Sequence, residues 1–301
     1  MTGMRYEVEH RTRYGYAKSA RRCVLMLCLE PVSAPGQRVV EFEIETEPAA
    51  SLSPERDGFG NRRHVLNVHR RHRGLTITSR FQVERDAGPR TGEADRLESE
   101  PGREAGDGWE AVRAWSRLPE FWHLVRPSRL ARPSPALEDF ARRERLEPDD
   151  DPMTSIQRLS DRIHHAFDYQ TGSTSADSPI EHMLESGLGV CQDYSHVMIA
   201  IARSWGVPSR YVSGYLHTTG RPGEPTVATG SHAWVECRLP GAGWVGFDPT
   251  NAACGDGRHI RVAVGRDYAD VSPTSGVFQG SGDAEIEVDV IVNAVGPMGP
   301  R

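Results

Sequence analysis

Three residues whose side chains could share a covalent reaction occur in the order Cys191, His232 and Asp248. A thiolate can attack an amide carbonyl carbon, and an imidazole can accept the thiol proton and later protonate the leaving amine. A carboxylate can hold that imidazole in the tautomer that the reaction needs. The three residue types therefore fit nucleophilic chemistry, provided that the fold brings them together.

Cys191 lies at the expected start of a helix. In the segment GLGVCQDYSHVMIAIARSWGVP, apolar residues recur at helical spacing from Tyr194 to Trp205, and Gly206 and Pro208 end the pattern. The unpaired N–H groups and the positive dipole end of a helix N-terminus favour the thiolate over the thiol. A packed, inert cysteine at a helix end is the alternative interpretation of this segment alone.

His232 and Asp248 fall on two expected strands. Alternation in SHAWVECRL places His232, Trp234 and Glu236 on one strand face. Asp248 follows the short strand GWVGF and precedes Pro249, where the chain must turn. If these strands are antiparallel neighbours joined by the LPGAG turn, His232 and Asp248 lie close together at the open ends of the hairpin. The pattern predicts a helix-borne thiol that faces a sheet-borne imidazole and carboxylate.

The elements that must position these residues follow a β-rich start. Short strand-like runs separated by Pro, Gly and Asn predict an all-β, sandwich-like domain over residues 1–85. Residues 86–107 are charged and rich in Gly and Pro, which is typical of a linker or mobile loop. Helical patterns up to about Trp205, followed by strands, predict an α+β domain over residues 108–301.

The composition limits the classes of partner. The 301 residues carry a formal net charge of -6, whereas a surface that binds nucleic acid normally needs a basic excess. Charged residues near the start of the sequence, together with the lack of a long apolar run, argue against a secretory signal and a membrane span. We therefore expect a cytoplasmic protein that binds neither nucleic acid nor membrane.

Neither the cysteines nor the histidines predict a metal or cofactor site. The five cysteines contain no CxxC pair, and their odd number excludes a fully paired disulfide framework. His64 and His69 would face opposite sides of a strand, and the arginines around them repel a cation. No phosphate-binding loop motif occurs, so we expect no metal and no cofactor.

The segments GVCQDYSHVMIAIARSWGVPSRYVSGY, SHAWVEC, GWVGFDPTN and HHAFDY resemble the core of bacterial transglutaminase-like proteins. The β-rich start, with YEVEHRTRYGY and DGFGN, resembles the N-terminal accessory domain of that family. The resemblance implies a papain-like α+β transglutaminase core preceded by the all-β sandwich-like domain. It also implies that Cys191 is the nucleophile, His232 the general base and acid, and Asp248 the residue that orients His232.

Three further residues are candidates for the oxyanion site or for the lining of the substrate channel. Tyr169, in HHAFDYQ, could donate to an oxyanion beside the backbone N–H of Cys191, or could be a core aromatic. Gln192 could touch the substrate from the first turn of the helix. Trp234, next to the base, could form a wall of the substrate channel or pack in the core.

The expected reaction is acyl transfer or hydrolysis at an amide bond of a protein or peptide. The thioester on Cys191 would be released to water, as in a protease or amidase, or to a second amine, as in a transglutaminase. The alternative is a non-catalytic module that binds peptides or proteins on the same fold. Reactivity of Cys191 near neutral pH separates these classes, because a buried inert thiol stays unlabelled.

Overall fold

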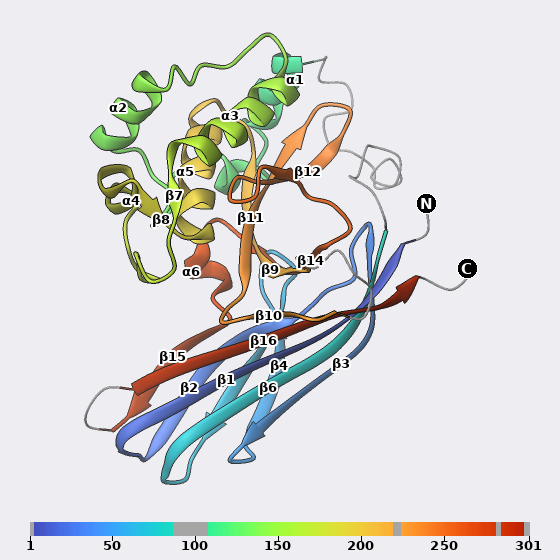
Figure 1. Ribbon diagram of the computed structural model, residues 1–301, viewed down its shortest axis with the longest axis vertical. Helices are drawn as coiled ribbons and strands as arrows, with labels where there is room; N and C mark the ends of the chain where they lie inside the picture. The colour runs from blue at the N-terminus through green and yellow to red at the C-terminus, as the bar shows by residue number, and fades with distance from the viewer. Residues whose placement is uncertain (1–2, 87–107, 219–223, 281–283, 298–301) are drawn as a thin grey trace.

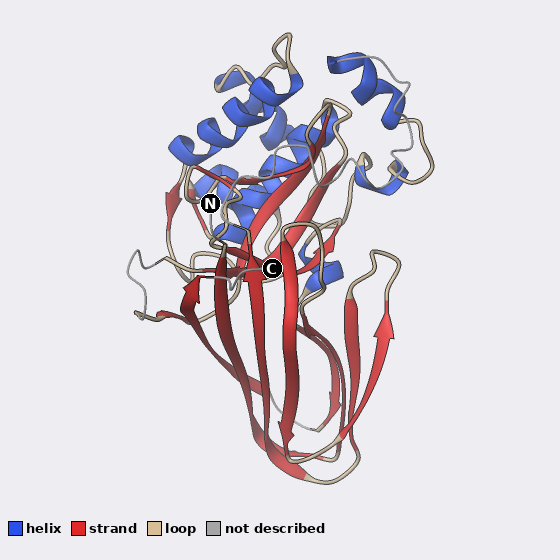
Figure 2. Ribbon diagram, turned by 90° about the vertical axis from the view of Figure 1, so that its right-hand side faces the viewer, coloured by secondary structure: helices blue, strands red, loops and turns tan. Residues whose placement is uncertain are grey.

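The computed structural model describes residues 3–86, 108–218, 224–280 and 284–297. Long strands form one half of the molecule and the helices surround a shorter sheet in the other half (Figures 1 and 2). The long strands are β1 (Met4–Ala20), β2 (Arg22–Glu30), β3 (Gln37–Glu47), β4 (Ser51–Arg56), β5 (Arg62–Val68), β6 (His72–Arg85), β15 (Thr274–Gln279) and β16 (Ala284–Pro297), joined by the short β10 (Thr226–Ala228).

These strands form a sandwich of two sheets. One sheet has the order β10-β16-β1-β6-β3 and the other β15-β2-β5-β4. Alternate side chains along β1 are buried, as expected for a strand with one face in a core. Leu25 and Leu66 of one sheet share a buried apolar cluster with Leu75 and Ile77 of the other, so the two inner faces close on each other. The sandwich-like domain predicted from the sequence is present.

The last strands of the chain complete this sandwich. β15 pairs with β2, and β16 pairs with β1 over most of its length, while β10 pairs with β16. Part of the region 108–301, which the sequence assigns to the α+β domain, thus pairs with strands more than 200 residues away, and a local pattern does not reveal such a partner. Residues 87–107 of the predicted linker lie outside the described residues.

The third sheet carries the catalytic candidates. Its strands are β9 (Ser209–Leu216), β11 (His232–Leu239), β12 (Gly243–Asp248), β13 (Ala253–Cys254) and β14 (His259–Gly265). They lie in the order β13-β12-β11-β9-β14, and every pair is antiparallel. β11 and β12 are joined by the turn that the sequence predicts, with Leu239 opposite Gly243. β14 is an edge strand of this sheet.

Helices surround this sheet (Figures 1 and 2). They are α1 (Gly108–Trp115), the 3₁₀ turn η2 (Trp122–Leu124), α2 (Pro135–Arg143), α3 (Pro152–Ala166), α4 (Ile180–Ser186), α5 (Cys191–Ser204) and α6 (Tyr268–Val271). α5 is buried along nearly its whole length and packs on β9 and β11. No helix in the described ranges is long and apolar enough to cross a membrane.

Two side-chain amides of the sandwich form hydrogen bonds with the backbone of β14, the edge strand of the third sheet. Gln37 donates from Nε2 to the carbonyl of Arg261 at 2.7 Å and accepts its N–H at 2.9 Å. Asn61 does the same with Val264, at 2.7 and 2.9 Å. Both amides are buried, so each acts as a substitute strand partner for backbone that would otherwise be unpaired.

Replacing Asn61 by leucine is expected to lower the free energy of unfolding by about 2–4 kcal/mol. Both polar backbone groups of Val264 lose a partner in a buried interface, and each unpaired group costs roughly 1–3 kcal/mol. Urea titration followed by circular dichroism measures the change. Gln279→Leu, at an exposed position of β15, is the matched control for loss of an amide. A loss no larger than that of the control would contradict this account.

Candidate active site

Cys191 is the first residue of α5, and a short pair of parallel strands positions the residues that precede it. β7 (Asp168–Tyr169) pairs with β8 (Leu188–Gly189), two residues before the cysteine. Asp193 then accepts the N–H of Val190 at 2.9 Å, which closes the first turn. A Cβ atom at Gly189 would lie 2.7 Å from the sulfur of Met183, so a larger residue here would displace that side chain.

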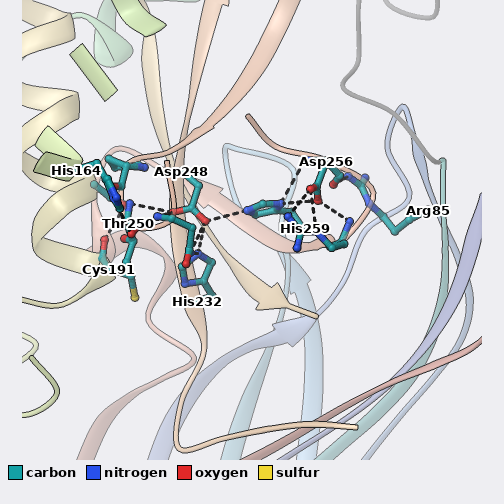
Figure 3. A network of polar contacts seen from close by, with 12 residues as sticks. Arg85, His164, Cys191, His232, Asp248, Thr250, Asp256 and His259 are labelled. Atoms are coloured by element: carbon teal, nitrogen blue, oxygen red, sulfur yellow. Dashed lines mark hydrogen bonds and ion pairs between the residues drawn. The ribbon is translucent and has the colours of Figure 1, made fainter. Parts of the chain in front are cut away.

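His232 and Asp248 meet across the β11–β12 hairpin. Nε2 of His232 donates to Oδ2 of Asp248 at 2.8 Å. Cys191 also lies near the imidazole, close enough to contribute to the raised pKa of His232. Figure 3 shows the cysteine sulfur and Asp248 on either side of the His232 ring. The structure thus brings together the three residues that the sequence singles out.

The carboxylate of Asp248 has zero solvent exposure and five hydrogen-bond donors. Oδ1 accepts the backbone N–H groups of Thr250 and Asn251, at 3.1 and 3.2 Å. Oδ2 accepts from His232, from the Asn251 amide at 2.8 Å and from Nε2 of His259 at 3.0 Å. Donors on both oxygens stabilise the charged form of a buried carboxylate.

These contacts set the charges of the site. Burial lowers the pKa of His232, but hydrogen bonds to Asp248 and Cys191 outweigh it and raise the pKa from 6.5 to about 10. Burial would raise the pKa of Asp248, yet the bonds from His232 and His259 hold it well below its ordinary value. His232 is therefore held as an imidazolium beside Cys191 at neutral pH, with Asp248 as its counter-ion.

Sequence reasoning missed His259 and Asn251. Both touch the oxygen atom of Asp248 that His232 touches, and Asn251 lies 3.5 Å from Nε2 of His232. Asn251 stands in the GFDPTN segment directly after Asp248, so its nearness along the chain was a usable signal. His259 begins an ordinary strand pattern, RHIRVAVG, and only the pairing of β14 with β9 brings it to the site.

His232, Asp248 and His259 are also the side chains that could form a metal-ligand set, with ligand-type atoms within 4.8 Å of one another. Their geometry is that of hydrogen bonds. Both ring nitrogens approach one carboxylate oxygen at 2.8 and 3.0 Å, whereas ligands on a tetrahedral zinc ion stand about 3.3 Å apart. A charged Asp248 needs both nitrogens protonated, which leaves them no lone pair for an ion.

A cavity of about 610 Å³ opens beside the thiol. Cys191 and His232 line it, together with Tyr169 and Asn251. Val290 and Val292 of β16 also line it, so the sandwich contributes part of the wall. Cys191 itself is 9% exposed and His232 is partly exposed, which leaves both within reach of a bound substrate.

The three secondary candidates take different places. Tyr169 is 54% exposed and lines the cavity, and burial together with the charge of Cys191 raises its pKa. Gln192 is buried and donates to the carbonyl of Ala176 at 3.1 Å. Trp234 is 2% exposed and lies behind the catalytic candidates, with its ring 6.2 Å from that of His232. Of these three, Tyr169 alone is among the residues that line this cavity.

Comparison with known proteins identifies the family. The model of the transglutaminase-like superfamily matches residues 141–249, and that of the bacterial transglutaminase-like N-terminal region matches residues 6–84. The chain therefore belongs to the transglutaminase-like superfamily, as its motifs predict, and combines the core with the bacterial N-terminal region. The predicted fold class, a papain-like α+β core with an all-β sandwich-like domain, is confirmed as well.

Similar proteins include both uncharacterized and named members. An uncharacterized protein of Mycobacterium tuberculosis is 34% identical, over 97% of this chain and 92% of the relative. A protein-glutamine gamma-glutamyltransferase of Pseudomonas aeruginosa is 30% identical over 33% of this chain and 16% of its own length. A solved structure of a candidate cysteine protease from Cytophaga hutchinsonii aligns with a TM-score of 0.76 and 19% identity, covering 100% and 93% of the two chains.

The charge of the His232–Asp248 pair predicts a specific pH dependence of stability. Because the folded pKa of His232 lies above 6.5, its protonation stabilises the fold fully below about pH 6.5, and this contribution is lost as the pH rises towards 10. The difference in unfolding free energy between the wild type and Asp248→Asn is therefore expected to be largest near pH 6 and to shrink towards pH 10.

Urea titrations at several pH values measure this difference. In a His232→Ala background, the cost of Asp248→Asn is expected to vary less with pH between 6 and 10, because the contribution of His232 is gone and only His259 remains beside the carboxylate. A cost that stays constant with pH in the wild-type background would contradict the assignment of charge to this pair.

Proposed function

We propose that the protein catalyses thiol-dependent acyl transfer or hydrolysis at an amide bond, with Cys191 as nucleophile. The observation that carries this proposal is the placement of Cys191 beside His232, which is hydrogen-bonded to Asp248, with the thiol at a helix N-terminus and beside a cavity. The likeness to a glutamyltransferase and to a candidate cysteine protease supports the same class of chemistry.

In the first half-reaction the Cys191 thiolate attacks the carbonyl carbon of the amide and forms the C–S bond. The backbone N–H of Cys191 and the phenol of Tyr169 are the proposed donors to the oxyanion. His232, protonated at the start, gives its proton to the leaving nitrogen as the C–N bond breaks. The products are a thioester and free ammonia or amine, and Asp248 holds the imidazole in place throughout.

In the second half-reaction the neutral His232 removes a proton from water or from an acceptor amine. The new bond to the carbonyl carbon forms, the C–S bond breaks, and Cys191 leaves as the thiolate with His232 protonated again. Water gives hydrolysis and an amine gives transfer. The cavity supports a peptide or protein substrate, because its volume exceeds what a primary amide group fills and its walls come from both the core and the sandwich.

Rapid alkylation of Cys191 at low pH is the first expected outcome. Iodoacetamide should label the wild type well below pH 8.5, the ordinary range of a thiol, and His232→Ala should lose this low-pH labelling because the thiolate loses its counter-ion. Cys191→Ser is the blank. Labelling that is slow and indifferent to His232 would refute the proposal and favour a non-catalytic binding module.

The other cysteines give this measurement a low background. Cys23, Cys28 and Cys237 are buried, and burial raises the pKa of each. Cys254 is partly exposed, but burial raises its pKa as well. None of the four should compete with Cys191 below neutral pH. Peptide mapping of the labelled protein checks the assignment.

Formation of a thioester is the second expected outcome. With an activated ester as acyl donor, intact-mass spectrometry should show one acyl group on the wild type and none on Cys191→Ser. Glutamine-containing peptides then separate the two fates, because hydrolysis releases ammonia alone whereas transfer also incorporates hydroxylamine or another added amine. An acyl group retained equally by Cys191→Ser would contradict the role of this thiol.

A further inference from the structure

A second histidine holds the carboxylate of Asp248. His259, the first residue of β14, is 1% exposed, and its Nε2 lies 3.0 Å from the same Oδ2 atom that His232 contacts. Figure 3 shows Asp248 between the two rings, with His259 and Asp256 continuing the row on the side away from Cys191. The proposed reaction assigns no step to His259.

The direction of these hydrogen bonds follows from the charge of Asp248. A carboxylate offers only acceptors, so Nε2 of His232 and Nε2 of His259 must both carry a proton and donate it. Nδ1 of His259 lies 3.2 Å from Oδ1 of Asp256 and 3.3 Å from the Asp256 N–H, so Asp256 holds the ring from the side opposite Asp248. His259 is therefore a donor aimed at the oxygen that orients the proposed base.

The element that carries His259 is held by the sandwich. Gln37 and Asn61 pair with the backbone of β14, two and five residues after His259, and the Arg85 guanidinium donates to the carbonyl of Asp256 at 3.3 Å. These contacts approach β14 and the turn before it from the N-terminal domain. The sandwich thus restrains the strand that carries His259, in addition to the pairing of β14 with β9.

We propose that His259 is a positioning residue that fixes the carboxylate of Asp248, and through it the His232 imidazole, against a frame anchored in the sandwich. This inference rests on the proposed function, since it assigns a part in orienting the base. The ring of His259 also packs edge-on against Trp234, at 5.1 Å between centroids, and Trp234 lies beside the His232 ring at 6.2 Å. His259 therefore contacts both Asp248 and Trp234, the two residues that lie beside the His232 ring.

Two substitutions separate positioning from packing. In His259→Gln the side-chain amide can place an N–H donor near the position of Nε2, whereas His259→Leu fills similar space without a donor. His72→Leu is the matched control, because His72 is a buried histidine of the sandwich, hydrogen-bonded to the carbonyl of Arg70 and remote from the site. All three are measured as the full-length protein.

The first readout is the Nε2–H resonance of His232 in protein labelled with ¹⁵N-histidine, assigned by its loss in His232→Ala. This signal reports the bond to Asp248 whether or not the protein is an enzyme. It is expected in the wild type, in His259→Gln and in His72→Leu, and is expected to be lost or shifted in His259→Leu. An unchanged signal in His259→Leu would overturn the proposal.

The second readout is the rate of Cys191 alkylation at pH 6. His259→Leu is expected to reduce this rate several-fold, because the imidazolium beside the thiol is less well held, and His259→Gln should restore most of it. An equal loss in His259→Gln would overturn positioning through the donor. If the wild type itself shows no low-pH alkylation, the proposed function fails, while the His232 resonance still decides whether His259 positions Asp248.

Discussion

The structure of the site depends on keeping one fully buried carboxylate charged. Transfer of an unpaired carboxylate from water to a protein interior costs several kcal/mol, so Asp248 requires donors on every side. The turn after β12 supplies two backbone N–H groups and the Asn251 amide, and β11 supplies His232. These groups leave one direction open, towards β14, and His259 fills it. The same saturation that stabilises the charge also fixes the orientation of the carboxylate.

An edge strand is a weak place on which to mount such a contact, because one side of its backbone lacks a partner. In this protein the sandwich supplies the partner through the amides of Gln37 and Asn61. The C-terminal strands β15 and β16 pair with the sandwich after the last strand of the core. The core is therefore an insertion between strands of the sandwich. The sandwich therefore restrains the core in two ways: through the amide contacts with β14 and through the sandwich strands that precede and follow the core.

The sequence predicted the parts that depend on local periodicity. Helical spacing placed Cys191 at a helix start, and alternation with a short turn placed His232 and Asp248 on one hairpin, where the structure has them. The role of His259 was not predicted, because nothing in its own strand pattern distinguishes it. Its partner, Asp248, lies on β12, which is not a neighbour of β14 in the sheet. The pairing of β16 with β1 was not predicted for the same reason, since local patterns reveal strands but not their long-range partners.

The cavity beside Cys191 depends on the same sandwich. Val290 and Val292 of β16 are among the residues that line it, and β10, which pairs with β16, leads within four residues to His232. A shift of the sandwich would change the shape of the cavity and the position of β14 together. The uncharacterized mycobacterial relative matches this chain over both units, whereas the glutamyltransferase matches about a third of it. The combination of sandwich and core is thus shared with the mycobacterial relative. In this chain the sandwich lines part of the cavity beside Cys191.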